Sequence, residues 1–281
     1  MLAQTNSFKQ KVKKSIYAPE YTDKRYVEEY LNFHKERFAR TANLIKGVIK
    51  PTDKVVDLGT YGCLVPVFKD IFGLTDITCT LDLQENALSH ESTILHSASK
   101  GEQYPFIRDR FNLESPFPYP NDTFDIVAFT EVLEHLTVDP MYTLSEINRI
   151  SKSGAHLVLS TPNCASSLSF YKILRGQNPF IFPHFIKDRS TDRHNREYTF
   201  KEVKSMIETA GYKILYIKAI NVYYTTWKKQ AAVSLIEICL MLLSFLTFGI
   251  IQGKNRGDTI LVLARKQSAM KERHPDFLYY P

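Results

Sequence analysis

The segment KVVDLGTYGC, residues 54–63, is the part of the chain that decides the fold. Its apolar, β-branched start is typical of a short buried strand, and the strand ends at a glycine turn that begins at Gly59. Glycines at a strand-to-helix turn let the backbone approach a bound cofactor closely. Apolar spacing predicts a helix over residues 64–72 directly after this turn. The segment therefore predicts the first strand, turn and helix of an α/β unit.

The rest of the chain alternates strand and helix patterns. Asp139 and Pro140 predict the start of a helix that Gly154 closes, and a capping box from Thr199 to Glu202 begins a later helix. Such alternation predicts an α/β, Rossmann-like, doubly wound sheet of seven mostly parallel strands with an antiparallel last strand. In such sheets ligands bind at the carboxyl ends of the strands. After the first strand, the others are predicted at residues 76–83, 104–108, 124–129, 155–160, 212–220 and 258–265.

Length and charge suggest one domain with appendages. The 281 residues suit a single α/β domain, predicted at 51–265, between a basic N-terminal helical segment at 1–50 and a tail at 266–281. An amphipathic pattern over residues 26–50 predicts a helix leading into the domain. The net charge of +6 resides in the first fifty residues. It favours an anionic partner such as nucleic acid, lipid headgroups or a phosphorylated substrate, or it is a solvated helix face.

The four cysteines indicate neither a disulfide framework nor a metal site. Cys63, Cys79, Cys164 and Cys239 are far apart, without a C-x-x-C pair or histidines at metal spacing. This pattern suits a reducing, cytoplasmic location. We therefore predict no bound metal.

A carboxylate at the end of the second predicted strand points to a ribose. Asp82 stands where dinucleotide-binding folds place an acid that accepts both ribose hydroxyl protons. The turn after Gly59 lacks a G-x-G-x-x-G run, however. A nucleoside without phosphates is therefore the favoured ligand.

Four further motifs follow in order. They are FNLE at 111–114, PFP at 116–118, NDTFDIV at 121–127 and TEVLEHL at 130–136. With the first turn and Asp82, they resemble the class I S-adenosylmethionine-dependent methyltransferases of the broad small-molecule group, types 11 and 23. The resemblance covers roughly residues 50–220 and includes HNREYT at 194–199, which is similar to an element before a late helix in that group.

The resemblance implies S-adenosyl-L-methionine as methyl donor. Asp57 and Gly59 would line its methionine part, Asp82 would hold its ribose, and Leu83 would lie beside the adenine. Tyr61 and Cys63 replace glycines of the fuller first motif, which we interpret as variation because Gly62 is retained. The full set of residues expected to bind the donor is Asp57, Gly59, Gly62, Asp82, Leu83, Asn112, Leu113, Thr130 and Glu131.

Two histidines are candidates for the base that deprotonates an oxygen or nitrogen acceptor. His135 is the first, because it follows the fourth strand at the carboxyl edge, and His194 is the second. The alternative is a structural role in the loop. Arg196 and Tyr198 alternate with His194 and are expected to line the acceptor pocket. In the alternative, Arg196 pairs with a carboxylate and holds the covering segment to the core. The irregular insertion at 163–196 is predicted to cover the acceptor, or else to decorate the surface.

Residues 229–252 predict a hydrophobic helix before the last strand. Within it, positions 231–251 carry a single charge, Glu237, and are long enough to span a bilayer. Spanning would separate two strands that pair in one sheet. We therefore expect contact with a membrane surface or a protein partner, with burial against the N-terminal helix as the alternative. If the helix contacts a membrane surface, we expect the protein to lie peripherally at the inner face of that membrane.

The favoured function is methylation of an oxygen on a small molecule, sugar or lipid-linked intermediate. A nucleic-acid methyltransferase is the runner-up, supported by the basic N-terminus but made unlikely by TEVL at 130–133, which differs from the N/D-P-P-Y/F motif of base-amino methylases. A non-catalytic scaffold that binds donor and recruits partners is the third alternative. Salt-dependent nucleic-acid binding would favour the second, and failure to bind donor the third.

Overall fold

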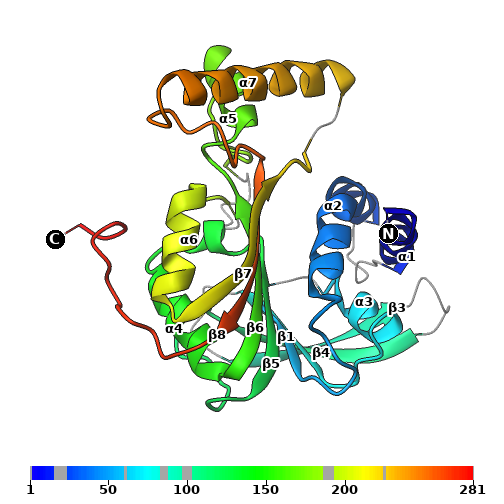
Figure 1. The fold of residues 1–281 in the computed structure, drawn as a ribbon. Coiled ribbons are helices and arrows are strands. Elements are labelled where there is room, and N and C mark those ends of the chain that lie inside the picture. The colour runs from blue at the N-terminus through cyan, green and yellow to red at the C-terminus, as the bar shows by residue number, and fades with distance from the viewer. Residues whose placement is uncertain are drawn as a thin grey trace.

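A single mixed sheet with helices on both faces forms the body of the molecule (Figure 1). The eight strands run in the order β3-β4-β2-β1-β5-β6-β8-β7. Central strands are buried on both faces, and all three residues of β1, two valines and Asp57, are buried. The strands are β1 Val55–Asp57, β2 Ile77–Asp82, β3 Ser89–His96, β4 Gln103–Phe111, β5 Phe124–Thr130, β6 Ser151–Pro162, β7 Tyr212–Ile220 and β8 Thr259–Lys266. The computed structural model describes residues 2–15, 24–59, 62–82, 88–96, 103–185, 193–223 and 226–280.

Helices cover the two faces of the sheet in separate groups. Helices α1, α2 and α3 lie on one face, and α4 and α6 lie on the other (Figure 1). Each group packs on its own apolar core against the sheet. The helical elements are α1 Leu2–Ser15, α2 Lys24–Ile45, α3 Val65–Asp70, the 3-10 turn η1 Leu133–His135, α4 Pro140–Ile150, α5 Ser167–Leu174, α6 Phe200–Thr209 and α7 Trp227–Leu246.

The sheet reverses its winding at β1. This strand pairs in parallel with β2 on one side and with β5 on the other. The carboxyl end of β1 is therefore the topological switch point, where open α/β sheets bind ligands. The glycine turn predicted after residue 58 stands at that point.

The caps predicted from the sequence are confirmed. The Asp139 carboxylate accepts the backbone N–H of Tyr142 at the start of α4, at 3.0 Å. Thr199 and Glu202 form the reciprocal capping box of α6. Each such cap is worth about 1 kcal/mol, because it satisfies backbone donors that the helix itself leaves open.

The fold class is confirmed, with two corrections of detail. The sheet has eight strands rather than seven, because β3 pairs antiparallel with β4 at the edge. The sequence SHESTILH of β3 is largely polar and has no long apolar run, so pattern alone did not indicate it. Gly154 does not close α4, which ends at Ile150. It has a φ of 77° inside β6, where the pairing with β5 shifts register.

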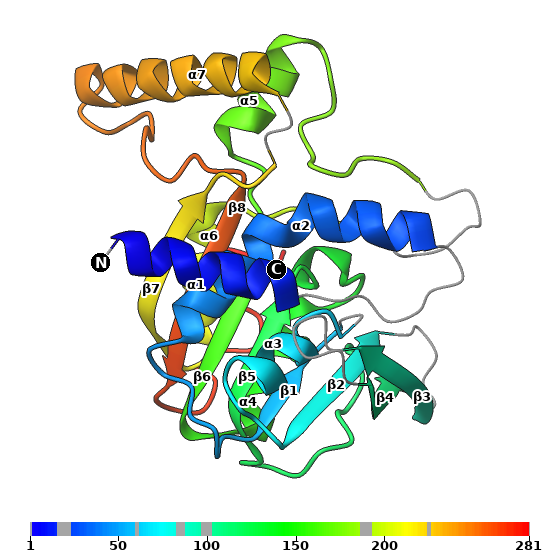
Figure 2. The same cartoon turned by 90° about the vertical axis from the view of Figure 1, so that its right-hand side faces the viewer.

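Helices α5 and α7 form a lobe at the carboxyl edge of the parallel strands (Figures 1 and 2). Helix α5 follows β6 and α7 follows β7, and these two strands run parallel because each pairs antiparallel with β8. The two helices meet around the buried side chains of Leu168, Tyr223 and Val233. The predicted hydrophobic helix ends earlier than expected, at Leu246, because Phe248 and Gly249 take positive φ angles.

The expected arrangement of β7 and β8 is also confirmed. They are antiparallel neighbours over residues 212–220 and 259–266. The alternative that α7 is buried against the N-terminal helix is wrong, because only 11% of its most apolar window is buried and α7 packs against α5, apart from both α1 and α2 (Figures 1 and 2).

Candidate active site

The turn after β1 requires glycine. Gly59 has a φ of 63°, and a Cβ placed on it would lie 2.8 Å from Cγ1 of Val132. Its N–H donates to the Thr80 hydroxyl at 3.0 Å, which ties the turn to β2. Gly62 also has a positive φ, 79°. L side chains rarely adopt this conformation, so glycine suits both positions of the turn.

The carboxyl ends of β1, β2 and β4 lie next to one another. Asp82, the last residue of β2, is in register with Phe111, the last residue of β4. Asn112 and Leu113 follow directly, and the Asn112 side-chain oxygen accepts the Glu114 N–H at 2.8 Å. Leu113 is buried. The Asp82 side chain and Leu83, like Thr60 and Tyr61 in the first turn, lie outside the described residues.

Asp57 is buried beneath the turn. The side chain of this last β1 residue is fully buried. Burial, reinforced by the charge of Asp57, raises the pKa of the Cys63 thiol to about 12 and raises the pKa of the Cys79 thiol well above its ordinary value of 9.0. Both thiols are therefore neutral at physiological pH and serve as packing groups.

These strand ends suit a nucleoside sulfonium donor. Two glycines with left-handed φ angles stand at the switch point, and a residue with a carboxyl side chain ends the adjacent strand. Asn112 supplies an amide and Leu113 an apolar surface at the third strand end. Gly59, Gly62, Asp82 and Asn112 thus stay the positions that we predict to hold the donor.

A second set of groups gathers at the ends of β5 and β6. Glu131, directly after β5, has a φ of 56°, which costs a non-glycine residue about 1–3 kcal/mol. Its carboxylate accepts the Ser160 hydroxyl at 2.8 Å and the Tyr223 hydroxyl at 2.6 Å. The guanidinium Nε of Arg37 on α2 lies 3.9 Å away. The neighbouring Thr130 is buried. Their predicted donor contacts stay a prediction.

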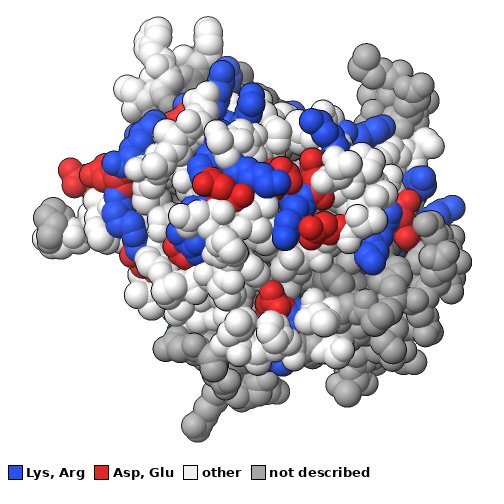
Figure 3. All heavy atoms as spheres, turned by 90° about the horizontal axis from the view of Figure 1, so that it is seen from below, with Lys and Arg blue, Asp and Glu red and all other residues white. Residues whose placement is uncertain are grey.

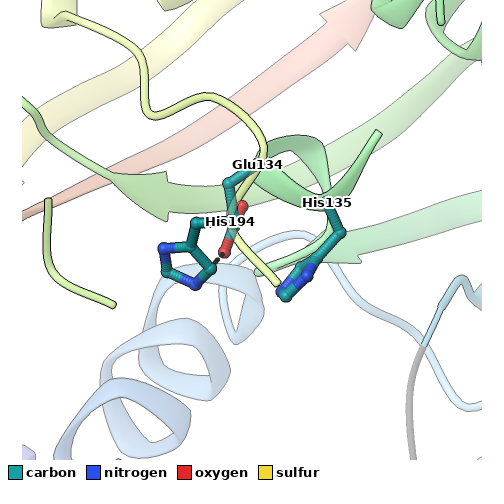
Figure 4. A group of neighbouring side chains, drawn as sticks. All are labelled: Glu134, His135 and His194. Atoms are coloured by element: carbon teal, nitrogen blue, oxygen red, sulfur yellow. Dashed lines mark ion pairs between the residues drawn. The ribbon is translucent and has the colours of Figure 1, made fainter. Parts of the chain in front are cut away.

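Glu134 is the most buried acid of this set. Its side chain is fully buried in η1, and one carboxylate oxygen accepts the Thr161 hydroxyl at 2.9 Å. The other lies 3.9 Å from Nε2 of His194, as the dashed line in Figure 4 marks. Burial, together with the charge of Glu131, raises the pKa of Glu134 to about 8. This carboxyl group therefore gains or loses its proton near neutral pH.

The two histidines predicted as candidate bases lie together. The rings of His135 and His194 are 5.0 Å apart between centroids and meet edge to face. Nδ1 of His135 lies 3.0 Å from the Arg193 carbonyl oxygen, and Nδ1 of His194 lies 2.8 Å from a Glu197 carboxylate oxygen. A carbonyl oxygen and an ionised carboxylate only accept, so each Nδ1 is the protonated nitrogen and each Nε2 carries the lone pair.

The segment at 193–198 is fastened to η1 by Asn195. Its side-chain amide donates to the His135 carbonyl at 2.7 Å, and its backbone N–H donates to the Glu134 carbonyl at 2.8 Å. Glu197 is buried and also accepts the Ile181 N–H at 2.6 Å. These bonds bring residues sixty positions apart in the chain into one cluster.

Arg196 and Tyr198 differ from His194 in burial and partners, and their predicted place in the acceptor pocket stays a prediction. Tyr198 is only 2% exposed and packs in the main core. Arg196 is exposed and forms an ion pair with Glu202 at 2.7 Å, as the alternative interpretation predicted. The hydrogen bonds of 193–198 break a regular extended strand, so alternation does not hold there.

Helix α2 supplies groups that the sequence did not indicate as site residues. Arg37 is buried, and His34 contacts Tyr223 edge to face at 5.8 Å between centroids. Burial, followed by the charges of Arg37 and His194, lowers the pKa of His34 to about 2. In the sequence, the polar residues on the inner face of this amphipathic helix were the signal that could have indicated a role in the site.

The insertion at 163–196 also contains a helix that the sequence did not indicate. This helix, α5, begins after Ser166, whose hydroxyl accepts the Ser169 N–H.

Comparisons with known proteins agree with this geometry. A methyltransferase-domain family model matches residues 27–217. An uncharacterized methyltransferase of Schizosaccharomyces pombe is 29% identical over 131 residues, covering 44% of this chain and 45% of that protein. The chain thus matches less than half the length of this curated relative.

Solved structures show the same fold. A SAM-dependent methyltransferase from Archaeoglobus fulgidus has a TM-score of 0.51 at 15% identity, covering 86% of this chain and 100% of that one. A putative methyltransferase of Haloferax volcanii, solved with the Trm112 methyltransferase activator, has a TM-score of 0.51 at 15% identity, covering 84% and 93%. With the family model spanning most of the sequence, the chain belongs to the class I methyltransferases, whose methyl donor is S-adenosyl-L-methionine.

Proposed function

We propose that this protein methylates an oxygen of a small molecule, a sugar or a lipid-linked intermediate. The observation that carries the proposal is the pairing of His135 and His194 at the carboxyl edge that also bears the donor turn. The donor supplies an electrophilic methyl group on a sulfonium. Transfer forms a carbon–oxygen bond, breaks the carbon–sulfur bond and requires the hydroxyl to lose its proton.

The histidine cluster is suited to promote that proton loss. Each Nδ1 is held by an oxygen acceptor, so both rings are fixed in the tautomer whose Nε2 carries a lone pair. Asn195 holds both backbone segments in place. Positioned proton-transfer groups of this kind typically contribute about 10²–10⁴-fold to a rate.

The reaction can be tested with donor labelled on its methyl carbon. Wild type and His194→Ala are incubated with polar and lipid extracts, and label is counted in the aqueous and organic phases. Label that is stable as an ether and depends on His194 supports oxygen transfer. Label on nitrogen, or transfer unaffected by His135→Ala and His194→Ala, contradicts the proposal.

Helix α7 supports a location at a membrane surface. It has a mean hydropathy of 1.7 and is long enough to cross a membrane, yet only 11% of its most apolar window is buried. Trp227 is 74% exposed, Phe245 81% and Phe248 98%. Both ends of the helical segment connect to neighbouring strands, which favours a helix lying on the membrane over one that crosses it. The apolar surface is flanked by the basic residues Lys228, Lys229 and Lys254. Basic side chains in this position attract the anionic headgroups of a membrane.

A groove of about 590 Å³ lies along this segment, lined largely by apolar side chains such as Met241, Leu246 and Phe248. Such a groove favours a lipid chain, and hence a lipid-linked acceptor. Flotation with vesicles of neutral and anionic phospholipid tests this location. Wild type should float and Phe245→Asp should not, while Lys204→Asp on α6 serves as the control.

A protein partner is the competing occupant of α7. The Haloferax volcanii neighbour is in complex with an activator protein. Failure of wild type to float on either vesicle would contradict the membrane location and favour such a partner.

Nucleic acid is a less favoured acceptor. Lys9 and Lys13 of α1 and Arg40 of α2 form ion pairs with the single carboxylate of Glu36, so part of the N-terminal charge is neutralised. On the face seen from below, basic and acidic side chains are interspersed (Figure 3). Nucleic-acid surfaces instead gather one sign of charge.

A further inference from the structure

The cysteine spacing predicts no bound metal, but we propose that Glu134, His135 and His194 bind a divalent transition-metal cation. The ligand atoms of the three side chains lie within 4.8 Å of one another, and they converge from η1 and the 193–198 segment (Figure 4). This inference deepens the proposed function, because the cation would act on the same acceptor hydroxyl.

The two histidines are held in the way that metal-bound histidines usually are. Such rings donate the distal N–H to a carboxylate or a backbone carbonyl, which fixes the tautomer and raises ligand basicity. His194 donates from Nδ1 to Glu197 at 2.8 Å, and His135 donates from Nδ1 to the Arg193 carbonyl at 3.0 Å. Nε2 is then the ligand atom of both rings.

Glu134 provides an independent observation. Its Oε1 is buried and has no hydrogen bond within the described part of the chain, while Oε2 accepts the Thr161 hydroxyl. The nearest basic atom to Oε1 is Nε2 of His194, at 3.9 Å, beyond hydrogen-bond distance. A buried carboxylate oxygen without a donor is costly, and a bound cation would remove that cost. The oxygen also faces the nitrogen with which it would share the ion.

The ligand set selects the class of cation. Two imidazoles and one carboxylate suit Zn²⁺, Fe²⁺, Co²⁺ or Ni²⁺ rather than Mg²⁺ or Ca²⁺, which prefer all-oxygen sites. Zinc–nitrogen bonds are about 2.0–2.1 Å, so ligand atoms on one ion lie at most about 4.2 Å apart. Small rotations of the side chains therefore close the site around an ion.

Three protein ligands leave at least one position open. An acceptor hydroxyl that binds there loses its proton to water more readily, because the cation stabilises the resulting alkoxide. The alkoxide oxygen then attacks the methyl group, and the sulfur of the donor takes the electrons of the broken bond. In this form of the reaction both histidines act as ligands rather than as proton acceptors.

Cobalt provides the test, because Co²⁺ reports its own coordination. Untagged, chelator-treated full-length protein is titrated with Co²⁺, followed by visible absorption, and with Zn²⁺, followed by calorimetry. We expect about one equivalent to bind and a low-symmetry cobalt spectrum to appear. His135→Ala and His194→Ala should weaken binding at least tenfold, and Glu197→Gln, which changes the acceptor of the His194 Nδ1 hydrogen bond, about 10–100-fold. His274→Ala in the tail is the matched control.

The same samples are titrated with S-adenosylhomocysteine, and thermal melting checks that each variant is folded. Metal binding that is absent in wild type, or unchanged in both folded alanine variants, overturns the metal site. If donor binding persists in that case, the proposed methyl transfer stands with a histidine as base. Metal binding without donor binding would instead contradict the proposed transfer and leave the metal site supported.

Discussion

The two halves of the carboxyl edge are built in different ways. At the ends of β1, β2 and β4, backbone turns and short-range motifs form the site, with Gly59 and Gly62 at positive φ. At the ends of β5 and β6, buried titratable side chains from η1, the 193–198 segment and α2 form it. The first half is local in sequence and the second is assembled across long separations. This difference suggests that the donor half is generic, while the histidine half carries the chemistry toward the acceptor.

The largest effect is expected in the histidine half. His135→Ala and His194→Ala should each lower kcat by about 10²–10⁴-fold, because either loss removes a group that promotes deprotonation. The affinity for S-adenosylhomocysteine should change less than about threefold, since neither residue belongs to the donor half. Steady-state kinetics and calorimetry on the same preparations check both values. A donor affinity that falls in parallel with kcat would erase the distinction between the halves.

A smaller effect is expected from the carboxylate of the donor half. Asp82→Ala should weaken S-adenosylhomocysteine binding by about 10–100-fold, because hydrogen bonds to a charged group are worth about 1.5–3 kcal/mol. Calorimetric titration gives the value. Asp76→Ala, at an exposed position just before β2, should bind like wild type. Equal affinities for Asp82→Ala and wild type would remove the ribose role.

The glycine turn should show its cost in stability. Gly59→Ala is expected to lower the free energy of unfolding by about 1–3 kcal/mol, because alanine is strained at this φ and its Cβ would meet Val132. Gly47→Ala is the matched control, since its Cβ meets nothing within 4 Å, and it should change stability by less than about 1 kcal/mol. Denaturant unfolding of both variants measures the two changes in the free energy of unfolding. A Gly59→Ala protein as stable as the control would contradict the account of the turn.

The smallest effect concerns the C-terminal tail, which contacts Asp139 at the start of α4. Burial raises the pKa of Asp139, but hydrogen bonds from Arg273 and Tyr279 outweigh it and lower the pKa overall. The stabilisation by this pair is therefore present above the ordinary carboxyl value of 3.8 and is lost as the pH falls through the lower folded value. Arg273→Ala should lower stability at pH 7 by no more than about 1 kcal/mol, since the pair is partly exposed. Thermal melting across pH should show the difference from wild type shrinking in acid.

How much the sequence revealed follows the same division. The turn at Gly59, the caps at Asp139 and Thr199 and the pairing of β7 with β8 were predictable, because each depends on a local pattern or on fold topology. The position of His135 beside His194 was expected only in outline. The contact between His34 and Tyr223 could not be predicted, because the sequence around each residue contains no sign that the other is its partner.

The most direct test of the account is calorimetric titration of wild type, Asp82→Ala and His194→Ala with S-adenosylhomocysteine. The account predicts saturable binding to wild type, strongly weakened binding to Asp82→Ala and near-wild-type binding to His194→Ala. Absence of binding to folded wild type would contradict the donor site itself. Binding lost in His194→Ala but retained in Asp82→Ala would contradict the division of the carboxyl edge into a donor half and an acceptor half.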